Sequence, residues 1–149
     1  MTKKIKMLVI PSDTSGCGYY RSLKPHTKLA EMYPDDFDID IKYEVNWGNV
    51  DEMLQYDIIH IHKGLFNDME TFRSTLNKCR ENGAVVVMDL DDYWDLGPYH
   101  PASKDIKRFG IDKLIKDNIK MVDYLTTTTD IFKKEIEKFL KALRDNINS

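Results

Sequence analysis

The sequence predicts one α/β domain, residues 1–149, built on a doubly wound, mainly parallel sheet of about five strands with helices on both faces. Short apolar segments alternate with helix-length amphipathic segments along the chain. The run at residues 84–90 is apolar without alternation, which is typical of a strand buried on both faces of a parallel sheet. With 149 residues, 42% of them hydrophobic, the chain is long enough for one core.

The first half of the chain predicts three strands. Residues 5–11 form a compact apolar strand, and residues 12–21 read as a loop by composition. A helix follows over residues 22–33, where Pro25 is acceptable only in the first turn. Residues 37–45 alternate apolar and charged side chains, as in a half-exposed strand near a sheet edge. A weakly helical stretch then leads into a buried strand over residues 56–64.

The second half repeats the alternation of helix and strand. A helix capped by Asn67 or Asp68 runs to about residue 81, and the strand at residues 84–90 follows it. After an acidic loop, helical spacing returns over residues 103–121, a β-branched strand follows over residues 122–129, and an amphipathic helix ends the chain. This order predicts right-handed βαβ units and therefore a Rossmann-like sheet.

Composition excludes some functions. The net charge of −3 argues against a general nucleic-acid binder, which is normally basic. The apolar run at residues 7–10 is far shorter than a signal-peptide core or a membrane span, so we expect a cytoplasmic protein. Cys17 and Cys79 are too far apart for a CxxC metal or redox motif.

A glycine-rich segment follows the first predicted strand. Gly16 and Gly18 flank Cys17, and backbone N–H groups in such a turn can approach a phosphate or another anion. Arg21 stands where the dinucleotide fingerprint has its third glycine, and its guanidinium can hold a diphosphate or a carboxylate. A surface turn with an exposed arginine is the alternative.

Two histidines share one side of the strand at residues 56–64. His60 and His62 could ligate a metal, but no third ligand lies nearby in the sequence, so we predict no metal site. We expect His60 to pack under a helix. His62, beside Lys63 and Gly64 at the carboxyl end of the strand, is expected to reach the cleft and touch a substrate hydroxyl.

Carboxylates crowd the end of the strand at residues 84–90. Asp89, Asp91, Asp92 and Asp95 must be solvated, share partners or have raised pKa values. Such a cluster can provide a general base or bind Mg²⁺. Strand alternation places Asp89 and Asp91 on one side of the chain and Asp92 on the other, so the carboxylates cannot all serve one centre.

Aromatic side chains follow the carboxylates. Tyr93, Trp94, Tyr99 and His100 form a possible platform for stacking a sugar or a base. The alternative is that Trp94 anchors the loop to the core, and the sequence does not decide between the two interpretations.

Four motifs in this order resemble a known family: the GxGxYR pattern at residues 16–21, YDIIHIHKG at 56–64, VVVMDLDDYWDL at 85–96 and VDYLTTTTDIFKKEI at 122–136. Together they resemble the amino-terminal, acceptor-side domain of GT-B glycosyltransferases, especially family-4-like and family-1-like enzymes of bacteria and phages. The resemblance covers nearly the whole chain. It implies transfer of a sugar, such as a hexosyl group, from a nucleotide-sugar donor to a carbohydrate or glycosylated acceptor.

The resemblance also implies roles for particular residues. The first loop, with Gly16, Gly18 and Arg21, would face the diphosphate of the donor. His62, Lys63 and Gly64 match the second loop, and Asp91, Asp92 and Tyr93 match the loop near the reacting sugar. We therefore expect three catalytic residues, Asp91, Asp92 and His62, and substrate or phosphate contacts from Gly16, Gly18, Arg21, Lys63, Gly64, Tyr93, Trp94 and Tyr99. The nucleotide sugar would be a substrate, and we expect no requirement for Mg²⁺ or another cofactor.

The family's carboxyl-terminal, donor-binding domain has no counterpart in the chain. We expect that the sequence is a fragment, that a partner subunit completes it, or that catalysis has been lost. Whether the chain acts as an enzyme stays open. The alternative is a stand-alone, non-catalytic module that binds a nucleotide or a sugar phosphate. A response-regulator-like switch is disfavoured, because the acidic cluster follows the fourth predicted strand.

Overall fold

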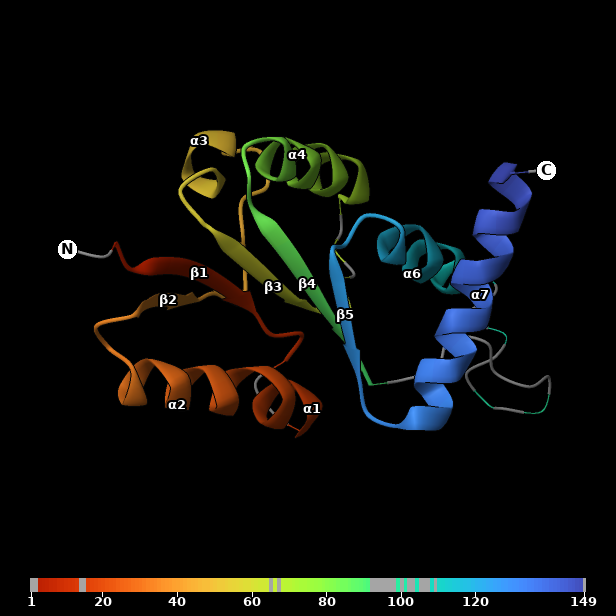
Figure 1. Ribbon diagram of the computed structural model, residues 1–149, viewed down its shortest axis with the longest axis horizontal. Helices are drawn as coiled ribbons and strands as arrows, with labels where there is room; N and C mark the ends of the chain where they lie inside the picture. The colour runs from red at the N-terminus through yellow and green to blue at the C-terminus, as the bar shows by residue number, and fades with distance from the viewer. Residues whose placement is uncertain are drawn as a thin grey trace.

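The computed structural model describes residues 3–13, 16–64, 66, 68–91, 99, 101, 104, 108 and 110–148. Within these residues a five-stranded sheet lies between two groups of helices (Figure 1). The prediction of a Rossmann-like α/β fold with a parallel sheet is confirmed.

All four pairings in the sheet are parallel, and the strand order is β2-β1-β3-β4-β5. The strands are β1 (Ile5–Ile10), β2 (Phe37–Ile41), β3 (Ile58–His62), β4 (Val85–Leu90) and β5 (Tyr124–Thr127). As predicted, the strand with alternating charges, β2, lies at an edge. The order reverses between β1 and β3, and doubly wound sheets bind ligands beyond the carboxyl ends of the strands at such a switch point.

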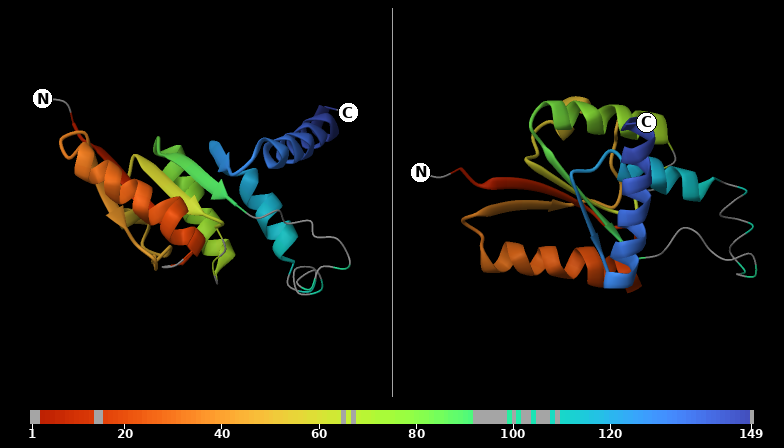
Figure 2. Two further views of the ribbon diagram at one scale, coloured as in Figure 1. Left: turned by 90° about the horizontal axis from the view of Figure 1, so that it is seen from below. Right: turned by 45° about the vertical axis from the view of Figure 1, so that its right-hand side comes forward.

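Helices cover both faces of the sheet, as Figures 1 and 2 show. On one face, α1 (Gly16–Gly18), η1 (Tyr19–Leu23) and α2 (Lys24–Met32) follow one another in a row. On the other face lie α3 (Val50–Met53), α4 (Met69–Glu81) and α6 (Ile111–Ile119). The last helix, α7 (Asp130–Asn148), lies beyond β5.

The predicted loop over residues 12–21 is wrong from Gly16 onward, because α1 begins there and η1, a π-helical turn, joins it to α2. The Gly18 N–H is bonded to Asp13 and the Arg21 side chain to Asp89, and these contacts stabilise helical backbone where the composition suggests a loop. In the π-helical turn the Lys24 N–H donates to the Tyr19 carbonyl. Pro25, in the first turn of α2, has no N–H to donate. π-Helical turns are rare and occur often at functional sites.

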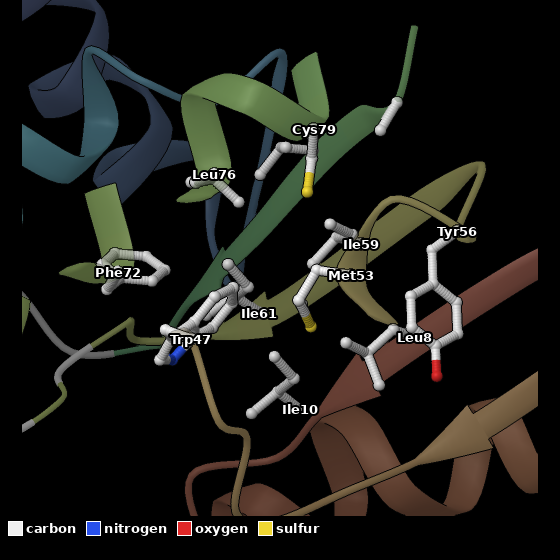
Figure 3. Close-up of a cluster of buried hydrophobic side chains, with 12 residues drawn as sticks. Leu8, Ile10, Trp47, Met53, Tyr56, Ile59, Ile61, Phe72, Leu76 and Cys79 are labelled. Atoms are coloured by element: carbon white, nitrogen blue, oxygen red, sulfur yellow. The ribbon is translucent and has the colours of Figure 1, made fainter. Parts of the chain in front are cut away.

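The main core lies between the sheet and the α3–α4 face (Figure 3). Leu8 and Ile10 from β1, Ile59 and Ile61 from β3, and Phe72 from α4 are among its fully or almost fully buried side chains. A second cluster joins β4 to the last two helices through Met88, Leu90, Ile115, Ile119, Phe132 and Ile136. Next to these clusters, the polar side chains of His62 and Asp89 lie near the carboxyl ends of β3 and β4.

Gly18, in α1, lies close to Asp13 in the segment that follows β1. A Cβ atom at this position would lie 2.2 Å from the carbonyl oxygen of Asp13, a distance that no side chain can tolerate. The Gly18 N–H also donates to Asp13 Oδ1 at 3.0 Å. The turn from β1 into the helix is therefore built around the missing side chain.

We expect the variant Gly18→Ala to lower the free energy of unfolding by about 1–3 kcal/mol, because the backbone around Asp13 must move to admit the methyl group. Urea unfolding followed by circular dichroism measures the change. Gly48→Ala is the matched control, since its Cβ would meet only the Asn46 side chain, at 3.2 Å. Equal losses for the two variants would contradict this account.

Candidate functional site

Polar and charged side chains gather at the carboxyl ends of β1, β3 and β4, next to the switch point of the sheet. The group comprises Ser12, Arg21, His62, Lys63, Asp89 and Asp91. His62 and Asp89 are direct partners across β3 and β4, and Asp89 in turn is paired with Thr126 on β5. Parallel pairing thus brings together residues from four separate segments of the sequence.

The imidazole of His62 lies between a hydroxyl and a carboxylate. Its Nδ1 is 2.7 Å from Ser12 Oγ, and its Nε2 is 3.1 Å from Asp91 Oδ1. We assign the ring proton to Nε2 because the Asp91 carboxylate can only accept. Nδ1 then accepts from the Ser12 hydroxyl. The three side chains form a hydrogen-bonded line, Ser12–His62–Asp91, in which a proton can move.

Only one end of this line is open to solvent. The His62 side chain is 0% exposed, whereas Ser12 is an exposed residue. A ligand therefore reaches the imidazole through the Ser12 hydroxyl. Ser12 was not predicted as a site residue, although its position just beyond β1, at the switch point, was a usable signal.

Asp89 holds Arg21 in place. Arg21 Nε donates to Asp89 Oδ2 at 2.8 Å, and Arg21 Nη2 donates to Oδ1. The hydroxyl of Thr126 donates to the same Oδ1 at 2.6 Å. The Asp89 side chain is 3% exposed and that of Arg21 is 30% exposed, so this is a largely buried, bidentate ion pair.

Asp89 was predicted to share a side of its strand with Asp91, and both carboxylates do face His62, with Nε2 3.9 Å from Asp89 Oδ2. Its role as the partner of Arg21 was missed. Asp89 occupies one bidentate edge of the guanidinium, formed by Nε and Nη2. The phosphate role of Arg21 stays a prediction.

The loop after β3 has a strained backbone. Lys63 and Gly64 both have positive φ, 69° and 72°. A Cβ atom on Gly64 would lie 2.9 Å from Met88 Cε, and its carbonyl accepts from Asn118 Nδ2 at 2.7 Å. The Lys63 N–H donates to the Asp89 carbonyl at 3.0 Å, while its Nζ lies 3.8 Å from Asp91 Oδ1. This loop therefore places the Lys63 ammonium beside the Ser12–His62–Asp91 line.

A cavity of about 250 Å³ opens over this group. Its walls include Ser12, His62 and Lys63 from the polar cluster, with Tyr43 and Phe66 opposite. Two of the three predicted residues of the second loop, His62 and Lys63, thus line a cavity at the switch point, and Gly64 is not among its described lining residues. The first loop contributes less, because the Gly18 amide is already bonded to Asp13. Gly16 begins α1 with a φ of 52°, and its anion contact stays a prediction.

Several predicted site residues lie outside the described part of the chain: Asp92, Tyr93 and Trp94, together with Asp95 and His100. Their proposed roles stay predictions. Tyr99 is described and is 98% exposed. An aromatic ring so open to solvent is available for stacking.

His60 packs under a helix, as predicted. Its ring centroid is 4.5 Å from that of His26 on α2. Burial, followed by the neighbouring charge of His26, lowers the pKa of His60 to about 4, and the Asp89 carboxylate opposes this shift. Burial likewise lowers the pKa of His26, whose Nδ1 is 2.7 Å from the Ser22 carbonyl. Both rings are therefore neutral at pH 7.

A metal centre finds no support in the described residues, where no three His, Cys, Asp or Glu side chains come together as a ligand set. In the same part of the chain, no helix combines the length and the apolar character needed to cross a membrane.

Comparisons with protein-family models, with curated proteins and with solved structures found no match to this chain. The resemblance to GT-B glycosyltransferases therefore rests on the order of the four sequence motifs.

We expect the free energy of unfolding to fall as the pH drops from about 6.5 to about 4. In this window the unfolded chain binds protons at His60 that the folded chain cannot bind, so protonation favours unfolding. Besides His26 and Asp89, the charges of His62 and Arg21 act on this ring, and both lower its pKa.

The loss attributable to His60 should be about 2–3 kcal/mol between pH 7 and pH 4, measured by urea unfolding at several pH values. His60→Phe keeps a ring against His26 but cannot titrate, so its stability should depend less on pH by that amount. Identical pH profiles for the two proteins would refute the assignment.

Replacing Asp89 by Asn should cost about 2–4 kcal/mol of stability, because the largely buried Arg21 guanidinium loses its charged partner. Asp38→Asn, which changes an exposed carboxylate on the edge strand β2, is the matched control and should change stability by less than about 0.5 kcal/mol. Thermal or urea unfolding of both variants tests the difference.

Proposed function

We propose that this chain is the acceptor-side domain of a glycosyltransferase, which moves a sugar from a nucleotide-sugar donor to the hydroxyl of an acceptor. The observation that carries the proposal is the Ser12–His62–Asp91 line beneath a cavity at the switch point of the sheet. The four motifs resembling the family agree with it. As part of this proposal we place the protein in the cytoplasm.

The line suits the activation of a hydroxyl group. An acceptor O–H in the cavity would pass its proton to Ser12 Oγ while Ser12 passes its own proton to His62 Nδ1. The acceptor oxygen would then form a bond to the anomeric carbon of the donor as the bond from that carbon to the diphosphate breaks. Asp91, bonded to Nε2, would stabilise the imidazolium that results.

The charges of the cluster favour an acceptor-side role over the alternative of a stand-alone phosphate-binding module. Arg21 and Lys63 carry two positive charges, and Asp89 and Asp91, which lie beside them, carry two negative charges. These four charges cancel, so they provide no net positive charge for a diphosphate. A donor-binding domain would have to meet most of the charge on the leaving group.

The test is sugar transfer by the protein purified from its own host, with whatever domain or partner accompanies it. Ser12→Ala and His62→Gln should each lower kcat about 10²- to 10⁴-fold, the usual contribution of a general base and its relay. Ser74→Ala on the exposed side of α4 and His26→Gln on α2 are the matched controls. Full turnover by both site variants would overturn the proposed mechanism.

Calorimetry with the 149-residue chain alone separates the two functions. Uridine diphosphate, uridine diphosphate glucose and glucose 1-phosphate serve as probes. Micromolar binding of any of them would favour the module, since half of a cleft should bind a nucleotide sugar weakly.

A further inference from the structure

A second and larger cavity lies beside the first. It measures about 450 Å³ and lies between the segment that follows β2 and the start of α4. Tyr43, Glu44 and Trp47 line it from one side, and Phe66, Asp68 and Thr71 line it from the other. Neither the four motifs nor the predicted site residues include this region, apart from its contact with the first cavity.

Trp47 has a buried donor without a partner. The residue is 6% exposed, and its Nε1–H has no hydrogen-bond partner among the described residues. The ring packs against Phe66 and Phe72, with centroids 5.2 and 4.7 Å apart, so its position is fixed. In Figure 3 the ring nitrogen lies on the side turned away from Ile61 and Phe72. Because leaving such a donor unbonded costs about 1–3 kcal/mol, an oxygen atom supplied by a ligand would be favoured there.

The lining of the cavity selects against anions. It contains the carboxylates of Glu44 and Asp68, and its described lining residues include no lysine or arginine. Asp68 already accepts from the amide and the hydroxyl of Thr71, at 3.1 and 2.6 Å. The Glu44 carboxylate forms no hydrogen bond or ion pair with the described residues, and it can accept from ligand hydroxyls.

Aromatic faces, a fixed N–H donor and a carboxylate acceptor together match an uncharged sugar ring. The C–H face of such a ring packs on aromatic side chains, and its hydroxyls both donate and accept. A cation is the other ligand that a carboxylate favours. However, the Trp47 N–H can only donate, and it calls for an oxygen acceptor.

The two cavities share a wall, since Tyr43 and Phe66 line both. We propose that the larger cavity binds an uncharged sugar ring of the acceptor, between Trp47 and Glu44, so that an adjoining hydroxyl reaches Ser12 in the smaller cavity. The assignment of this sugar to the acceptor rests on the proposed function. The sugar site itself stands on the geometry of the larger cavity.

The experiment uses the indole signals of the ¹⁵N-labelled 149-residue chain in two-dimensional NMR. The chain has two tryptophans, Trp47 and Trp94, and Trp47→Phe assigns their signals. The probes are the methyl glycosides of glucose, galactose, mannose and N-acetylglucosamine, with methyl glucuronide as the anionic counterpart. At least one neutral glycoside should shift the Trp47 indole signal saturably, and the glucuronide should bind roughly fivefold or more weakly than the glucoside.

Glu44→Gln supplies a second readout. It should weaken binding of the neutral glycoside and reduce the discrimination against glucuronide, while Glu81→Gln, an exposed change on α4, should do neither. A Trp47 signal that none of the four neutral glycosides moves at about tens of millimolar would overturn the sugar site. Glucuronide binding as strong as glucoside binding would also overturn it.

The outcome is separable from that of the proposed function. A shift of the Trp47 signal together with full turnover by Ser12→Ala and His62→Gln would leave a sugar-binding site and remove the proposed mechanism. Loss of turnover in those variants without any shift at Trp47 would do the reverse.

Discussion

The carboxylate of Asp89 is the group on which the polar end of this sheet depends. It accepts two hydrogen bonds from Arg21 and one from Thr126, and it lies across the β3–β4 pairing from His62. It therefore ties the first helical segment to β4 and β5. A buried carboxylate is stable only when it is paired and hydrogen-bonded, so the chain must supply these partners from distant parts of the sequence. The site around Ser12 is assembled on that arrangement.

The fold could be read from the sequence because its signals are local. Uninterrupted apolar runs such as residues 84–90 indicate strands buried on both faces, and the alternation over residues 37–45 indicated an edge strand. The strand order confirms the edge strand and places β4 inside the sheet, while Val85 and Val87 on one face of β4 are only partly buried. The error at residues 16–21 has a physical cause. Glycine-rich composition suggests a loop, but contacts with Asp13 and with the sheet stabilise helical backbone there.

The location of the site could be predicted from the sequence, but the contacts between its residues could not. That His62 and Lys63 would end a strand near the cleft followed from the topology rule for open sheets. The contacts of Ser12 with His62 and of Asp89 with Arg21 could not be predicted. They depend on the register between strands and on side-chain directions, which no local sequence pattern encodes. The cavity beside Trp47 was not predicted, because the alternation continues to residue 45 and predicted a strand there, whereas β2 ends at Ile41 and the segment that follows it lines the cavity. Asp92, Tyr93 and Trp94 remain as predicted from the resemblance.

The π-helical turn η1 also constrains the length of its segment. In a regular α-helix, each step of four residues overshoots a full turn by about 40°, so positions 18, 22 and 26 would drift away from one face. Here all three still face inward: Gly18 lies against Asp13 in the segment after β1, Ser22 is fully buried, and His26 packs on His60 of β3. The extra residue in the π-helical turn compensates for this rotation, so the three positions stay on one side of the segment. Removing or adding one residue between Gly18 and His26 would break the contacts at one end or the other, so this is a segment in which relatives of the protein should show substitutions but no gaps.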